Sequence, residues 1–207
     1  MIGIKNIKDY EEYVKLQKEK TEDPERRKKW EGKLNENTQK FIPTFKQYLT
    51  DFENYKNDHV YCLGARTGEE ALALRQLGFE KAIGTDLVPF MEHVIKDDIH
   101  NMQFKDGSVG LFYTNIFDHS IDPRKFLSEI FRCLKPSGRS FFQLQIGSQL
   151  DKYGVLFIDN PKDFEILAQE TGFDIYKSEK NEVLTPHNHG LNWNFILEKK
   201  IWKTFYL

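Results

Sequence analysis

From His59 onward, short apolar runs alternate with amphipathic segments, and this alternation constrains the fold more than any other feature. Strands are predicted over 60–63, 81–85, 94–95, 111–113, 141–146, 174–177 and 194–197, and helices over 69–77, 123–134 and 161–169. Such alternation is typical of an α/β fold, a mainly parallel seven-stranded sheet with helices on both faces. Because these sheets bind ligands at the carboxyl ends of their strands, functional residues are expected in the loops there.

The first 55 residues follow a different, helical pattern. Apolar residues recur at helical spacing over 6–20, and Asp23-Pro24 is a typical helix start, an aspartate cap before a proline. After a charged segment, a further apolar stripe runs over 41–52, with a proline expected in its first turn. The sequence therefore predicts two parts, a helical lid over 1–55 and a ligand-binding core over 56–207.

Charge and cysteine usage limit the partners and the compartment. Lys and Arg number 30 against 32 Asp and Glu in 207 residues, so the chain lacks the basic excess of general nucleic-acid binders. No apolar run approaches the ~18 residues of a membrane-spanning helix, and the first segment is too charged for a signal peptide. Cys62 and Cys133 lie in apolar runs and are interpreted as core thiols, which favours a reducing, cytoplasmic location.

No metal site is predicted from the sequence. Two cysteines without ligand spacing do not make a structural zinc site. His187 and His189 flank an asparagine in a polar loop and would need ligands from elsewhere in the chain, so they are interpreted as solvated.

The strongest local motif is Gly64–Gly68, which reads Gly-Ala-Arg-Thr-Gly between a predicted strand and a predicted helix. Backbone N–H groups of such a loop, together with the helix N-terminus, favour a negatively charged ligand group. Asp86 lies 22 residues after Gly64, at the end of the next strand, where a carboxylate accepts hydrogen bonds from ribose hydroxyls. The pair predicts a nucleoside ligand with an anionic group. The glycines could also mark only a tight turn, and Asp86 a solvated strand end.

Two common nucleotide-binding motifs are absent from this loop. A dinucleotide fingerprint has glycines where Arg66 and Glu69 stand, and Glu69 would repel a pyrophosphate. No Gly-Lys-Ser or Gly-Lys-Thr follows, so a Walker loop is absent too. The missing dinucleotide fingerprint counts against nicotinamide and flavin cofactors.

Five segments in order resemble class I S-adenosylmethionine-dependent methyltransferases, particularly the small type 11 group: 60–68, 83–87, 98–108, 115–119 and 129–138. The resemblance implies the Rossmann-like methyltransferase fold with S-adenosyl-L-methionine as cofactor. The cofactor-binding residues that it implies are Gly64, Ala65, Arg66, Gly68, Asp86, Leu87, Asp98, Ile99 and Asn115. It assigns the adenine amino group to Asp98 and places the loop Asn115–His119 beside the transferred methyl.

Three positions depart from the pattern of that family. The family usually has an acidic residue at Cys62, a glycine at Arg66 and commonly an aspartate at Gly110. Arg66 would be strained if its position needs a positive φ. Alternatively, the loop has a variant shape, and Arg66 binds the methionine carboxylate through a charge-assisted hydrogen bond.

The expected reaction is O-methylation of a small polar acceptor, with a sugar or glycan hydroxyl as first choice and another hydroxyl or an amine as alternatives. His119 is the candidate base, and Asp118 would orient its imidazole or hold the acceptor, although the two could also form a purely structural pair. The lid would close over the cofactor, and Gly147–Gly154, with Tyr153, would shape the acceptor pocket.

Two other functions stay open. A non-catalytic module that binds a partner protein is favoured by the altered glycine loop, but such a module has no chemical need for Asp86, Asp98, Asn115 and His119 together. A nucleic-acid methyltransferase is disfavoured, because the pattern [Asp/Asn/Ser]-Pro-Pro-[Tyr/Phe/Trp] is missing after the fourth strand, where the chain reads Asn-Ile-Phe-Asp.

Overall fold

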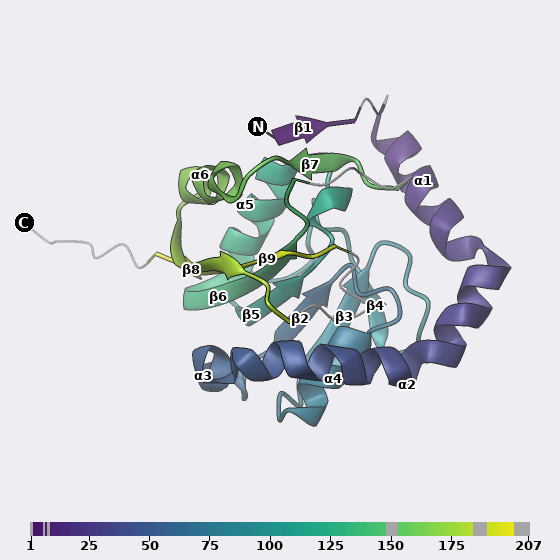
Figure 1. Cartoon of the computed structure of the whole chain (residues 1–207), viewed down its shortest axis with the longest axis horizontal. Coiled ribbons are helices and arrows are strands. Elements are labelled where there is room, and N and C mark those ends of the chain that lie inside the picture. Colours follow the sequence, from purple (N-terminus) through teal and green to yellow (C-terminus); the bar gives the residue numbers. More distant parts are fainter. Residues whose placement is uncertain (1, 6, 8, 148–152, 184–189, 201–207) are drawn as a thin grey trace, which may run out of the picture.

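The computed structural model describes residues 2–5, 7, 9–147, 153–183 and 190–200. Its centre is a seven-stranded sheet in the order β4-β3-β2-β5-β6-β9-β8, in which β9 alone runs antiparallel to its neighbours (Figure 1). The strands are β2 (Val60–Leu63), β3 (Ala82–Asp86), β4 (Val94–Lys96), β5 (Val109–Thr114), β6 (Leu134–Leu144), β8 (Phe173–Lys180) and β9 (Trp193–Lys199). The predicted mainly parallel α/β sheet is confirmed, with β6 beginning seven residues earlier than expected.

The register of the central strands brings their carboxyl ends to one edge. Leu63, the last residue of β2, pairs with Thr85 of β3 on one side and with Thr114 of β5 on the other. The residues that follow these three positions therefore emerge side by side, as expected for a ligand site in a parallel sheet. Asp86, the last residue of β3, pairs with Lys96 of β4 at the same edge.

Helices cover both faces of the sheet because alternate strand residues point to opposite sides. On one face, Phe112 and Phe142 pack with α5 (Pro123–Cys133) and α6 (Pro161–Thr171). On the other, Tyr113 and Phe141 pack with α4 (Glu69–Gln76) and with the end of α2 (Pro24–Gln47). The start of α5 follows the predicted capping pattern, since the Asp122 side chain accepts a hydrogen bond from the backbone of Lys125 at 2.9 Å.

The N-terminal helices lie partly outside and partly inside this core. α1 (Tyr10–Glu22) passes beside the carboxyl edge of the sheet, and α2 continues from it along α4 (Figure 1). Phe45, Tyr48 and Phe52 are almost fully buried, so the chain from the end of α2 through α3 (Leu49–Phe52) and a 3-10 turn η1 (Glu53–Tyr55) is part of the sheet's own core. Asp23 caps α2 as predicted, but α2 is continuous through Pro43, where a new helix was expected to begin.

A second, small sheet was not predicted. β1 (Ile2–Ile4) pairs antiparallel with β7 (Leu156–Ile158), and a 3-10 turn η2 (Phe117–His119) lies close to β7. Each of these elements has only three residues, too few for a periodic pattern to show. No helix in the described part of the chain is long and apolar enough to cross a bilayer.

Candidate functional site

The loop Gly64–Gly68 connects β2 to α4 at the carboxyl edge. Gly64 and Gly68 have φ values of +72° and +78°, and a Cβ on Gly64 would lie 2.3 Å from Cγ1 of Ile116. A Cβ on Gly68 would lie 2.6 Å from the ring of His93. Both positions therefore need glycine, because the backbone has a positive φ and because a Cβ atom would come too close to a neighbouring side chain.

Asp86 ties this loop to the end of β3. Its Oδ2 accepts a hydrogen bond from the backbone N–H of Arg66 at 3.1 Å, and its Oδ1 accepts one from Val88 at 2.8 Å. Burial raises the pKa of the Asp86 carboxyl, and the neighbouring Arg66 guanidinium acts in the opposite direction. Each carboxylate oxygen has a second lone pair, so the carboxylate can still accept hydrogen bonds from a ligand.

Most of the predicted site residues meet in two adjoining cavities. Gly64, Arg66, Asp86, Leu87, Asp98, Ile99 and His119 line the first, which we call the nucleoside cavity. Ala65 and Asn115 line the second, about 180 Å³ in volume, which lies between α2 and the glycine loop and which we call the α2 cavity. The two cavities share Gly64, Arg66 and Ile116.

Two predicted residues have other positions. Asp118 lines a third cavity beside β6 and β7, which shares Asn115 with the α2 cavity. Gly68 is the residue before α4, where its positive φ shapes the loop. The histidines at 187 and 189 and most of the segment 147–154 lie outside the described residues.

Arg66 adopts an ordinary backbone conformation. Among the described residues, Ser137 is the only non-glycine with a positive φ, so the strain considered for Arg66 does not arise. Its guanidinium lies over the Trp30 ring of α2, 5.0 Å from the ring centre, and its buried Nε has no hydrogen-bond partner. The Arg66 side chain therefore places a cationic group between the two cavities.

α1 forms the outer wall of the nucleoside cavity. Tyr13 and Gln17 line it, and the Tyr10 hydroxyl donates a hydrogen bond to Asp98. Burial raises the pKa of Asp98, but hydrogen bonds from His100 and Tyr10 outweigh this effect and leave that pKa below its ordinary value. The position of α1 is thus coupled to the residue expected to contact adenine.

Sequence reasoning missed two polar residues of this cavity, Asp97 and Gln17. Both are buried, and Asp97 Oδ2 and Gln17 Nε2 have no hydrogen-bond partner. Asp97 precedes Asp98 in the chain and could have been noticed there, whereas nothing in the sequence distinguishes Gln17 from the other polar residues of its helix.

His119 is held by the backbone of the segment before β7. Its Nδ1 lies 3.0 Å from the carbonyl oxygen of Tyr153 and its Nε2 lies 3.4 Å from Nζ of Lys20. Because a carbonyl only accepts, Nδ1 carries the proton, and Nε2 of the neutral ring is the basic nitrogen. Asp118 Oδ2 is 3.9 Å from Nε2, beyond hydrogen-bond distance, whereas the Tyr153 carbonyl lies within that distance of Nδ1.

These residues fit S-adenosylmethionine. A buried polar group without a partner costs free energy, so the unpaired donors on Gln17 and Arg66 and the unpaired acceptor on Asp97 favour a ligand with both donors and acceptors. The cofactor has ribose hydroxyls, amino groups and a carboxylate, and the Asp86 carboxylate lies in the same cavity.

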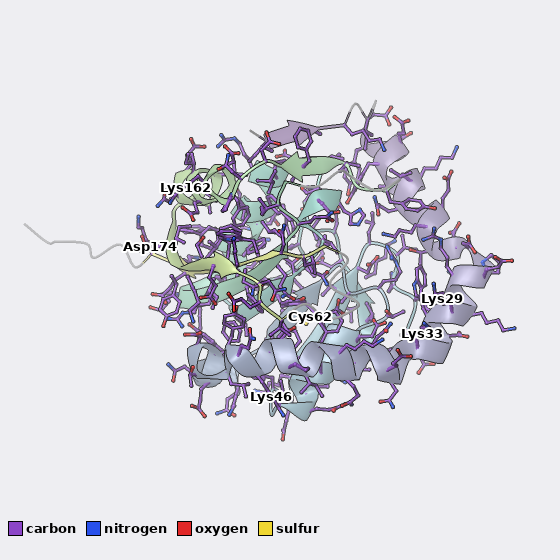
Figure 2. All side chains as sticks on the ribbon, viewed as in Figure 1. Lys29, Lys33, Lys46, Cys62, Lys162 and Asp174 are labelled. Atoms are coloured by element: carbon purple, nitrogen blue, oxygen red, sulfur yellow. The ribbon has the colours of Figure 1, made fainter. Side chains whose placement is uncertain are left out.

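Asp86→Ala is expected to weaken S-adenosylhomocysteine binding about tenfold or more, because the ribose contacts and the anchor of the Arg66 amide are lost together. Calorimetric titration measures this loss. Asp174→Ala is the matched control, since Asp174 lies at the side of the molecule opposite α1, paired with Lys200 (Figure 2). Unchanged affinity in a folded Asp86→Ala protein would remove the ribose assignment.

Comparison with known proteins agrees with this geometry. Residues 61–142 match the family model described as "Methyltransferase domain", which is less than half of the chain. No curated protein matches the chain.

Solved structures share the fold at low sequence identity. The [4+2]-cyclase SpnF has a TM-score of 0.56 and 13% identity, over 70% of this chain and 76% of that one. A SAM-dependent methyltransferase from Methanosarcina mazei has a TM-score of 0.55 and 16% identity, over 72% and 96%.

A Haemonchus contortus phosphoethanolamine N-methyltransferase 2, bound to S-adenosylhomocysteine, has a TM-score of 0.52 and 18% identity. The match covers 70% of this chain but only 49% of that longer one. Together, the strand order, the glycine loop with Asp86 and the family match show that residues 61–142 belong to a class I S-adenosylmethionine-dependent methyltransferase domain, with S-adenosylmethionine as its cofactor.

Proposed function

We propose that the chain transfers the methyl group of S-adenosylmethionine to a small polar acceptor that enters the α2 cavity. One observation carries this proposal: the nucleoside cavity and the α2 cavity share Gly64, Arg66 and Ile116. A donor bound in the first and an acceptor bound in the second would meet at the glycine loop.

The cofactor residues predicted from the sequence keep their roles in this proposal. Asp86 would bind the ribose, and Arg66 would bind the methionine carboxylate. Asp98 would bind the adenine amino group after its hydrogen bond with Tyr10 breaks. The support for Arg66 is its unpartnered Nε at the boundary of the two cavities. The support for Asp98 is its place in the nucleoside cavity beside Ile99.

For the reaction itself, bound S-adenosylmethionine supplies an activated methyl group on a sulfonium. The chain aligns the acceptor with that methyl, an effect worth up to roughly 7–11 kcal/mol in ideal models. A hydroxyl acceptor, with a sugar or glycan hydroxyl as first choice, also needs a base, and His119 Nε2 is the group proposed for it. The group proposed to orient this ring is the Tyr153 carbonyl, 3.0 Å from Nδ1, rather than Asp118, whose Oδ2 lies 3.9 Å from Nε2.

We also propose that the helical region before residue 55 acts as the cover of the site. The support is the contact of Tyr10, Tyr13 and Gln17 with the nucleoside cavity and of Trp30 with the α2 cavity. The mobile part in this proposal is α1, because the residues from Phe45 onward pack into the sheet's core.

The first experiment is a calorimetric titration with S-adenosylmethionine and S-adenosylhomocysteine, with NAD as control. Binding of the first two and not of NAD is expected. A screen with methyl-labelled donor then starts with sugars and continues with other alcohols and amines. Saturable binding without turnover on any acceptor would favour the non-catalytic module. A steep salt dependence of RNA or DNA binding would favour a nucleic-acid acceptor.

A further inference from the structure

The α2 cavity contains two buried acidic residues that the proposed cofactor contacts do not use. Glu69 and Glu70, at the start of α4, are each 7% exposed and both line it. Glu69 is satisfied, because Thr67 donates to its Oε2 and Asn37 to its Oε1 at 3.2 Å. Glu70 is not: Asn115 Nδ2 lies 3.5 Å from its Oε1, and its Oε2 has no partner.

A second unpaired acceptor lies in the same cavity. The side-chain oxygen of Asn37, on α2, is buried and has no hydrogen-bond donor. Two buried acceptors from different helices therefore line one space and lack donors. A buried acceptor without a partner costs free energy that a ligand N–H group would recover.

When Glu70 is ionised, the charge around this space favours a cation. Arg66 is the one cationic side chain among the described lining residues, against the two glutamates, and it lies against Trp30. Trp30 and Phe41 form apolar walls, and electrostatic attraction is stronger where such walls exclude water. The volume of about 180 Å³ is well above the ~10–15 Å³ of such space that one water molecule needs.

We propose that the α2 cavity binds a protonated amine through Glu70 and Asn37. The proposal rests on the methyl transfer proposed above and gives the ligand of the α2 cavity a chemical class, an ammonium group. Two sources share this chemistry: an acceptor that carries an amine, and the α-ammonium group of the cofactor itself. Because an ammonium nitrogen has no lone pair, that nitrogen would accept a methyl group only after it loses a proton. A hydroxyl on an amine-bearing acceptor is a methylation site that needs no such loss at the nitrogen.

The protonation of Glu70 gives the interaction a pH dependence. Burial, with Glu69 as a second cause, raises the pKa of Glu70 to about 8. The charged or titratable groups around it, on its own helix and on the packed elements, are Glu69, Arg66, Asp86, Cys62 and Tyr113. Below pH 8 the carboxyl holds a proton that a bound cation displaces, so affinity rises with pH, by nearly tenfold from pH 6 to pH 7.

The test uses ethylammonium as the probe and ethanol as its neutral control, titrated into the full chain saturated with S-adenosylhomocysteine. Ethylammonium stays charged across pH 6–8, since alkyl amines titrate near 10. The wild type is expected to bind it, more tightly at higher pH, and not to bind ethanol. Glu70→Gln is expected to weaken binding at least tenfold, and Glu80→Gln, which removes an exposed charge just after α4, to leave it unchanged.

Two ligands distinguish the two sources. If the ammonium is that of the cofactor, Glu70→Gln weakens S-adenosylhomocysteine binding at least tenfold but not that of 5′-methylthioadenosine, which lacks the amino-acid end. Ethylammonium then binds only the protein loaded with methylthioadenosine. Asn37→Ala, on the other helix, is the second variant and is expected to weaken binding of the same ligand. It keeps the test possible if Glu70→Gln fails to fold.

The proposal is overturned if Glu70→Gln and Asn37→Ala bind both ethylammonium and S-adenosylhomocysteine with the affinity of the wild type. Failure of the proposed methyl transfer looks different, because the wild type then binds neither S-adenosylmethionine nor its product. In that case ethylammonium binding to the cofactor-free chain still tests the α2 cavity by itself.

Discussion

Gly64→Ala is expected to weaken S-adenosylhomocysteine binding about tenfold or more, a loss of ~1.4 kcal/mol or more, because the glycine loop that lines the nucleoside cavity would be displaced. The new Cβ would lie 2.3 Å from Cγ1 of Ile116, so the loop or Ile116 must move. Overpacking of this kind costs about 1–3 kcal/mol, in addition to the ~1–2 kcal/mol of a side chain at positive φ. Calorimetry and chemical denaturation measure the two effects.

Gly107→Ala is the matched control for this substitution. Gly107 has φ of +64°, close to that of Gly64, but a Cβ there meets nothing within 4 Å. In the Gly107→Ala variant, the free energy of unfolding is expected to fall only by the ~1–2 kcal/mol that a side chain at positive φ costs. Cofactor binding is expected to stay normal. Equal losses of affinity in the two variants would show that the close approach to Ile116 plays no part.

His119→Ala is expected to lower turnover of a hydroxyl acceptor by roughly 10²–10⁴-fold, the usual contribution of a general base. Cofactor affinity is expected to change far less, because the proposed ribose and adenine contacts belong to Asp86 and Asp98, which line the same cavity. Single-turnover rates with labelled donor, compared with the dissociation constant of S-adenosylhomocysteine, separate the two effects.

Asp118→Asn provides the comparison on the neighbouring residue. Asp118 Oδ2 is 3.9 Å from the ring and faces a different cavity, so the rate should stay within a few-fold of the wild type. A large loss in Asp118→Asn with little loss in His119→Ala would transfer the role of base to the aspartate. An amine acceptor that reacts in its neutral form would make both variants nearly as active as the wild type.

Much of the sheet could be predicted because its strands are short apolar runs closed by glycine, proline or aspartate. The register that aligns Leu63, Thr85 and Thr114 follows from the parallel topology, and it brings Gly64 and Asp86 together, as expected. The cap at Asp122 followed equally directly, because an aspartate before a proline is a local signal.

Other parts depend on contacts that no local pattern encodes. The continuity of α2 through Pro43 depends on burial of Thr44 and Phe45 at its end, which tertiary packing supplies. Glu69 and Glu70 read as ordinary acidic residues of a first helical turn, and only their position under α2 makes them buried. The backbone angle of Arg66, which removed the expected strain, is likewise a property of the folded loop.

The small sheet of β1 and β7 has a kinetic consequence. β1 precedes α1, and β7 follows the Val155 amide, which donates to the carbonyl of Asp118, one residue before His119. α1 is therefore held in place at both ends, by the pairing of β1 with β7 before it and by the packing of α2 after it. If α1 covers the cofactor as proposed, release of the product S-adenosylhomocysteine requires α1 to move outward and the Tyr10–Asp98 hydrogen bond to break, and the residence time is then expected to depend on local opening of this one helix.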